Sequence, residues 1–166
     1  HGDVHHVKPT AVSLSQTSET GAVYTLDEIT AITAVAHEHG LKVHMDGARL
    51  AHSVAALGCT PAEMTVKAGI DVLSFGASKN GAFAAEAVVM FTPGLADEFA
   101  YRRKRGGHLF SKMRFLAIQF ETYLKDGLWL KMAGHANDCM KTLAQGLSEI
   151  GDVELLFPTN ANMLFA

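Results

Sequence analysis

The chain has 166 residues, of which 48% are hydrophobic and 19% charged, so it can bury one sizeable core and is too apolar for a disordered segment. The formal net charge is −3, and no basic stretch reaches the scale of a nucleic-acid-binding surface, which argues against nucleic acid or an anionic membrane as partner. No apolar run is long enough to cross a bilayer. Cys59 and Cys139 are too few for a disulfide framework, so we expect free thiols in a reducing, cytoplasmic compartment.

In chain order, short apolar runs predict strands, while capping boxes and a 3.6-residue periodicity predict helices. Thr25 and Glu28 form one capping box, and Thr60 and Glu63 form another. The predicted strands are 11–15, 41–45, 71–75 and 87–91. The predicted helices of this part are 25–39, 49–57, one opening at 60–63, and one from 92–93 to about 103.

Longer helical patterns follow at about 110–125 and 128–150, and they lead into a predicted strand at 153–157. Continuous apolar strands that alternate with helices predict an α/β fold, with a mainly parallel sheet and helices on both faces. The change of pattern after residue 105 indicates a second, C-terminal subdomain. The chain begins with His1 and ends in the strand-like segment 162–166, so we expect it to be a piece of a longer protein.

Polar residues follow three of the predicted strands. Asp46 and Arg49 lie in the stretch HMDGARL, Lys79 lies in SFGASKNG, and the loop QTSETG follows the first strand. Ligands of open α/β sheets bind beyond the carboxyl ends of the strands, so these groups are expected to converge on one cleft.

Lys79, Asp46 and Arg49 together suit one kind of chemistry. A lysine in a confined loop of small residues can form a Schiff base with a carbonyl, and a buried acid can keep a pyridine nitrogen protonated. An arginine one helical turn beyond the acid can hold a substrate carboxylate through its two-pronged guanidinium. Taken singly, the same residues also fit a solvated loop lysine, a turn-forming aspartate and a surface arginine. The combination favours pyridoxal 5'-phosphate (PLP).

These segments resemble the low-specificity L-threonine aldolases, PLP enzymes of the aspartate-aminotransferase fold (fold type I). The resemblance runs over nearly the whole chain and includes QTSETG, HMDGARL, SFGASKNG and the later RRKRGGHLFSKMRF. It implies a homo-oligomer, a dimer or tetramer with sites at the subunit interface. It also implies that residues 1–125 belong to the large PLP-binding domain, and that 126–166 form a linking helix and the start of a small C-terminal α/β domain.

The resemblance also assigns roles residue by residue. Lys79 matches the lysine that forms the Schiff base with PLP, Asp46 the partner of the pyridine nitrogen, and Arg49 the arginine that binds the carboxylate of the amino-acid substrate. His5 matches a histidine near the substrate hydroxyl, and Lys104 a basic residue near the phosphate or the substrate. No metal ligands are assigned. The family's phosphate-binding loop and ring-stacking residue would lie before residue 1, and a second carboxylate-binding arginine after residue 166.

The implied activity is cleavage of L-threonine, L-allo-threonine and related β-hydroxy-α-amino acids to glycine and an aldehyde. Other lyases of this fold, a phenylserine aldolase or a β-eliminating lyase, would share Asp46 and Lys79. A further alternative is a non-catalytic protein that retains the fold. The absence of Asp46 or Lys79 would have favoured that alternative, and both residues are present. A nucleotide-binding domain is disfavoured, because no G-x-G-x-x-G follows the first strand and no P-loop occurs.

Overall fold

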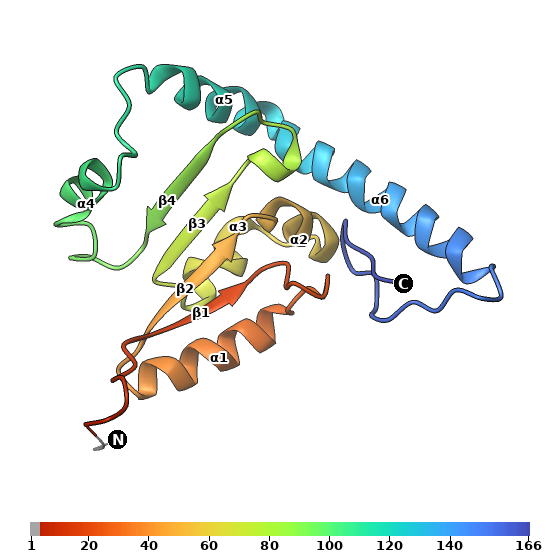
Figure 1. The fold of residues 1–166 in the computed structure, drawn as a ribbon, viewed down its shortest axis with the longest axis horizontal. Coiled ribbons are helices and arrows are strands. Elements are labelled where there is room, and N and C mark those ends of the chain that lie inside the picture. The colour runs from red at the N-terminus through yellow and green to blue at the C-terminus, as the bar shows by residue number, and fades with distance from the viewer. Residues whose placement is uncertain (1–3) are drawn as a thin grey trace.

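The structure is a computed structural model that describes residues 4–166. Within this range the strands form one sheet in the order β1-β2-β3-β4 (Figure 1). β2 runs parallel to both β1 and β3, whereas β4 returns antiparallel beside β3. The strand bounds are Ala11–Ser15 (β1), Lys42–Gly47 (β2), Val72–Gly76 (β3) and Glu86–Met90 (β4).

Two helices begin at the predicted capping boxes. α1 (Leu26–Glu38) follows Thr25, whose hydroxyl accepts the Glu28 N–H while the Glu28 carboxylate accepts the Thr25 N–H. Thr60 and Glu63 begin α3 in the same way. The remaining bounds are Leu50–Leu57 (α2), Pro61–Met64 (α3), Phe99–Arg105 (α4), Arg114–Leu124 (α5) and Leu128–Ser148 (α6), with 3₁₀ turns at Val66–Ala68 (η1), Ser78–Asn80 (η2) and Lys125–Gly127 (η3).

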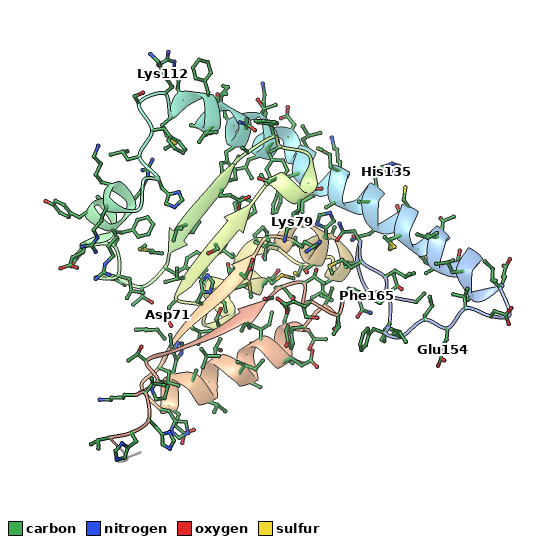
Figure 2. All side chains as sticks on the ribbon, in the orientation of Figure 1. Asp71, Lys79, Lys112, His135, Glu154 and Phe165 are labelled. Atoms are coloured by element: carbon green, nitrogen blue, oxygen red, sulfur yellow. The ribbon has the colours of Figure 1, made fainter. Side chains whose placement is uncertain are left out.

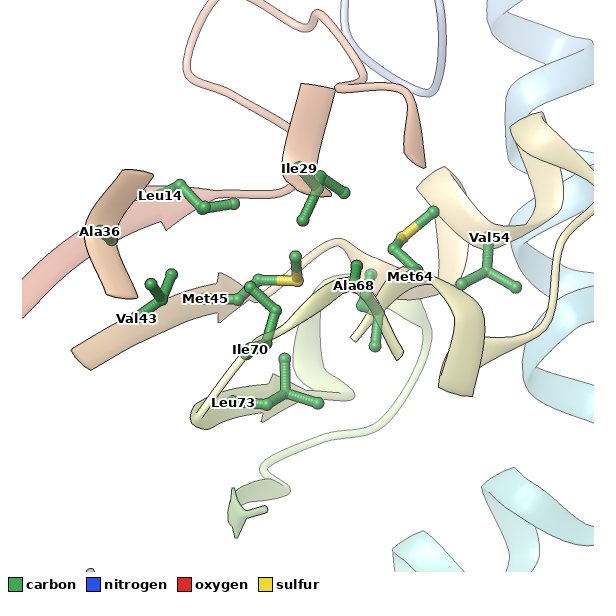
Figure 3. Packing of buried hydrophobic residues seen from close by; sticks show 11 residues of the cluster. Leu14, Ile29, Ala36, Val43, Met45, Val54, Met64, Ala68, Ile70 and Leu73 are labelled. Carbon is green, nitrogen blue, oxygen red and sulfur yellow. The ribbon is translucent and has the colours of Figure 1, made fainter. Parts of the chain in front are cut away.

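The main hydrophobic core lies on one face of the sheet. β2 alternates, so that Val43 and Met45 are completely buried while His44 and Asp46 point to the opposite face. Because side chains alternate with a period of two, a slip of one residue would bring Asp46 into the core, and the apolar pattern therefore fixes where this acid points. Figure 3 shows the packing of Leu14, Ile29, Ala36, Val43, Met45, Val54, Met64, Ala68, Ile70 and Leu73.

A smaller aromatic cluster lies under the turn that follows β3. The ring of Phe75 lies 5.5 Å from that of Phe120 on α5 and meets Trp129 of α6 edge-on at 5.7 Å between centroids. Tyr123, nearly completely buried, joins the same group. Offset and edge-on aromatic pairs each stabilise a fold by about 0.5–1.5 kcal/mol beyond their buried area. The cluster thus anchors α5 and α6 to the carboxyl end of β3.

At the opposite end of the sheet, a buried carboxylate joins several segments. Asp71 accepts hydrogen bonds from the Val43 N–H (2.8 Å), Lys42 Nζ (3.1 Å), His37 Nε2 (2.9 Å) and the Thr92 hydroxyl. Burial alone would raise the pKa of Asp71, but these donors outweigh it and hold the pKa well below its usual range. Figure 2 shows Asp71 at the end of the sheet far from Lys79, so its role here is structural.

One predicted helix begins later than expected. The pattern predicted a helix opening at Thr92-Pro93, which is wrong, because residues 93–98 form turns and α4 begins at Phe99. The reason is Gly94, whose φ of +85° is left-handed and cannot be part of a right-handed helix.

The strands expected near the C-terminal end are also wrong. Residues 153–157 and 162–166 are irregular and share a backbone hydrogen bond from the Leu156 N–H to the Phe165 carbonyl (2.9 Å). The rings of Phe157 and Phe165 meet edge-on at 6.2 Å. A strand requires a ladder of successive hydrogen bonds to a partner, and an apolar run by itself supplies only the side chains.

The predicted fold class, an α/β fold with a mainly parallel sheet and packed helices, is confirmed. The division into 1–125 and 126–166 stays a prediction. Along residues 4–166, none of the helices combines the length and the apolar character that crossing a bilayer requires.

Candidate active site

A cavity of about 160 Å³ opens at the carboxyl ends of β1 and β2, beside the turn after β3. This is the edge at which open α/β sheets bind ligands. Asp46, Arg49 and Lys79 line it together, so the structure brings together three of the residues singled out in the sequence. The other lining residues are Ser15, Thr17, Ser18, Glu19, Ala48 and Met163.

Asp46 is held at the end of β2 by backbone contacts. Its Oδ1 accepts the Ala48 N–H at 2.9 Å, and its carbonyl accepts the Gln16 N–H at 2.8 Å. Gly47 follows because a Cβ there would lie 2.9 Å from the backbone oxygen of Ser74, closer than packing allows. Within residues 4–166 no donor is bound to Asp46 Oδ2, so this oxygen can accept a proton-bearing nitrogen from a ligand.

Arg49 is the N-cap residue of α2, one turn beyond Asp46. Its Nε is buried and has no hydrogen-bond partner in the described part of the chain. Leaving a buried donor unsatisfied costs about 1–3 kcal/mol, more for a charged group, so an anionic ligand would relieve this cost. Burial, and then repulsion by Arg49, lowers the pKa of the neighbouring His52 to about 4. His52 is therefore neutral near pH 7 and adds no second positive charge beside the guanidinium.

Lys79 is exposed, but the turn that carries it is anchored on both sides. Ser78 Oγ donates to Glu86 Oε1 at 2.7 Å. Asn80 is buried, and its Nδ2 donates to the Tyr123 hydroxyl (2.7 Å) and to the Trp129 carbonyl (2.8 Å). Gly81 closes the turn with a φ of +104°, a value that favours glycine. The result is a fixed backbone that presents a flexible amine to the cavity.

The structure does not bring His5 or Lys104 to this cavity. His5 precedes the amino end of β1, whereas the cavity lies beyond the carboxyl end of that strand. Lys104 lies on α4, which follows β4. Because β4 runs antiparallel to β3, it ends at the end of the sheet opposite the cavity, and α4 lies beyond that end. The roles that the resemblance gives to these two residues stay predictions.

The loop QTSETG follows β1, and its pattern alone predicted no role for its individual residues. In the structure Thr17 lines the cavity while its hydroxyl pairs with that of buried Ser53 (2.8 Å). Glu19 also lines it, and its Oε1 accepts a hydrogen bond from Ser15 (2.9 Å). The position of this loop directly after a predicted strand was the signal that could have identified them.

The lining groups fit PLP. A carboxylate can face the pyridine nitrogen, an amine can react with the aldehyde, and the unpartnered Arg49 Nε calls for an anionic group. Within residues 4–166, no group of three or more His, Cys, Asp or Glu side chains is arranged to hold a metal ion.

The fold and the site together define a class: an α/β protein with an acid and a lysine at neighbouring strand ends. A family model described as β-eliminating lyase matches residues 1–166. The chain belongs to the β-eliminating lyase family.

Among curated proteins, a low-specificity L-threonine aldolase of a Pseudomonas species (strain NCIMB 10558) is 50% identical over 163 residues, covering 98% of this chain and 47% of that protein. Among solved structures, the threonine aldolase of Leishmania major matches with a TM-score of 0.91 and 33% identity, covering 98% of this chain and 47% of that one. Cystalysin of Treponema denticola, which contains PLP, matches with a TM-score of 0.63 and 16% identity over 92% of this chain and 40% of its own, and shows a shared fold. The chain spans about half the length of the curated relatives it matches.

Proposed function

We propose that the whole protein is a PLP-dependent carbon–carbon lyase. It would cleave L-threonine, L-allo-threonine and related β-hydroxy-α-amino acids to glycine and an aldehyde. The observation that carries this proposal is the convergence of Asp46, Arg49 and Lys79 on one cavity. It is supported by 50% identity to a low-specificity L-threonine aldolase over nearly the whole chain.

Asp46 and Lys79 would hold the cofactor from two sides. The Asp46 carboxylate would keep a proton on the pyridine nitrogen, and the Lys79 amine would carry the cofactor until substrate arrives. When bound, PLP supplies an electron sink for the bond that breaks at the substrate's Cα. The anchored turn around Lys79 fixes where its amine can act, and the Ala48 N–H fixes the orientation of the Asp46 carboxylate.

Arg49 would bind the carboxylate of the amino acid. A planar guanidinium pairs with a carboxylate through two parallel hydrogen bonds, and the buried Arg49 Nε has a donor to spare. Because Arg49 lies one turn beyond Asp46, both residues move with the same strand end. This would fix the substrate's Cα relative to the cofactor ring.

His5 and Lys104 enter the proposal through the resemblance alone. His5 would accept the proton of the substrate's β-hydroxyl, and Lys104 would lie near the phosphate or the substrate. Both lie away from the cavity, and for Lys104 we propose that the site it serves belongs to a neighbouring subunit.

We further propose a cytoplasmic homo-oligomer, a dimer or tetramer, that acts on small amino acids and not on nucleic acid or membranes. Exposed aromatic side chains, Phe83, Tyr101 and Phe115, supply apolar surface of the kind that subunits bury. Cys59 and Cys139 are free thiols, as a reducing compartment would leave them. The large domain would comprise 1–125, and the linking helix and small domain would begin in 126–166.

A second candidate is a β-eliminating lyase, because that is the description of the matching family. It would use Asp46 and Lys79 in the same way, and a phenylserine aldolase would do so too. A non-catalytic protein is disfavoured, since the acid and the lysine both line the cavity.

The deciding experiment incubates the whole protein and PLP with L-threonine, and separately with L-serine. The proposed function predicts equal amounts of glycine and acetaldehyde from threonine and none from Lys79→Ala. Pyruvate and ammonia from serine, without glycine from threonine, would favour the β-eliminating lyase instead.

A further inference from the structure

One wall of the cavity comes from a distant part of the chain. Met163 lies beyond α6, yet it lines the same space as Asp46, Arg49 and Lys79. Every other lining residue except Ala48 is polar or charged. Met163 is therefore the one large apolar side chain among the lining residues of residues 4–166.

Contacts with the loop after β1 hold Met163 in place. A Cβ on Gly21 would lie 3.2 Å from both Cβ and O of Met163, so the backbones approach closely here. The Val23 N–H donates to Asn160 Oδ1 at 3.4 Å, and Ala161 is 2% exposed. Figure 2 shows this returning segment, near Phe165, beside the end of α2. Met163 is thus a positioned wall and not a loose chain end.

We propose that Met163 contacts the substituent on the substrate's Cβ and sets the preference for a small alkyl group over an aryl group. This inference rests on the proposed function. With the carboxylate on Arg49 and the amine directed to the Lys79 side, the apolar substituent on Cβ can face Met163, the one large apolar side chain among the described lining residues. Methionine is unbranched and can change its rotamer, so it can accommodate several small substituents. A bulky aryl ring on Cβ would instead collide with the thioether.

The test compares Met163→Ala with Met163→Leu in the whole protein. Truncation removes the thioether and opens space, whereas leucine nearly conserves the volume. We expect Met163→Ala to raise the ratio of kcat/KM for phenylserine to that for threonine by about tenfold or more, the scale of discrimination that a few methylenes provide in an apolar pocket. Met163→Leu should leave the ratio nearly unchanged. Unaltered ratios in a Met163→Ala variant that cleaves threonine would overturn the inference.

A second measurement does not depend on turnover. Peroxide converts accessible methionines to sulfoxides, which peptide mass spectrometry locates. O-Methyl-L-threonine cannot undergo retro-aldol cleavage because its hydroxyl is blocked, and it should slow oxidation of Met163 several-fold. Met140, which is also partly buried and lies on α6 outside the cavity lining, is the internal control.

The two proposals fail in different ways. If the wild-type protein releases no glycine from threonine, the proposed function is wrong, and the oxidation pattern alone then decides whether Met163 borders a ligand. Equal oxidation of Met163 with and without the analogue would reject the inference that Met163 contacts the bound ligand. Protection of Met163 without protection of Met140 would support it.

Discussion

The Asp71 carboxylate offers a sharp test of how the sheet is held together. Its Oδ1 accepts from Lys42 and Thr92, and its Oδ2 from His37 and the Val43 N–H. In Asp71→Asn one oxygen becomes an NH₂ group, so whichever way the amide turns, it faces a group that can only donate: Lys42 Nζ on one side or the Val43 N–H on the other.

The magnitude follows from the exposure of those donors. Losing the acceptor of a buried donor costs about 1–3 kcal/mol. The Lys42 and His37 side chains are 49% and 42% exposed, so solvent screening limits their share to roughly 1 kcal/mol or less. We expect the free energy of unfolding to fall by about 3 kcal/mol in Asp71→Asn, which corresponds to roughly 6–12 °C in Tm for a chain of this size.

The effect must also depend on pH. The folded-state pKa of Asp71 is lowered. Its contribution to the free energy of unfolding is therefore complete above the unfolded-state pKa of about 3.9 and is lost as pH falls below that value. Asparagine does not titrate. The stability gap between wild type and Asp71→Asn should therefore be widest near pH 7 and narrow as pH falls from about 5 towards 3.

Urea denaturation followed by circular dichroism at several pH values measures this gap. Asp152→Asn is the matched control, because Asp152 is exposed in the turn after α6 and should change stability by less than about 0.5 kcal/mol. A gap equal to that of the control, or one that stays constant with pH, would refute the reasoning.

Three further predictions concern the cavity. Borohydride treatment of the PLP-loaded whole protein should attach the pyridoxyl group to Lys79, and peptide mapping that finds it on another lysine would exclude Lys79. Asp46→Asn should retain PLP by absorbance but lower kcat by roughly a hundredfold or more, equivalent to about 2.7 kcal/mol or more; near-normal turnover would reject its role. Arg49→Lys keeps the charge and loses the planar fork, so KM for threonine should rise with little change in PLP absorbance, and an unchanged KM would exclude Arg49 from binding the carboxylate.

Local signals in the sequence were enough for much of the framework. Thr25 with Glu28 and Thr60 with Glu63 placed two helix starts, because a capping box is made by residues close in the chain. Apolar runs placed all four strands of the sheet to within about two residues, since burial on a sheet imposes a readable pattern. The same approach failed at Thr92-Pro93, where Gly94 adopts a left-handed conformation, and at 153–157, where no partner strand completes a ladder.

The sequence by itself determined the chemistry that this chain carries: an acid and an amine that each follow an apolar strand, and a guanidinium one turn beyond the acid. The carboxyl ends of neighbouring parallel strands lie at the same end of the sheet. Asp46 and Lys79 therefore had to lie near each other once β2 and β3 paired. Only the tertiary structure decided that Met163 borders the cavity and that Asn80 anchors the Lys79 turn to α5 and α6. Only it placed His5 and Lys104 elsewhere. The physical reason is that contacts between distant segments depend on how helices pack and where loops return, and no local pattern encodes them.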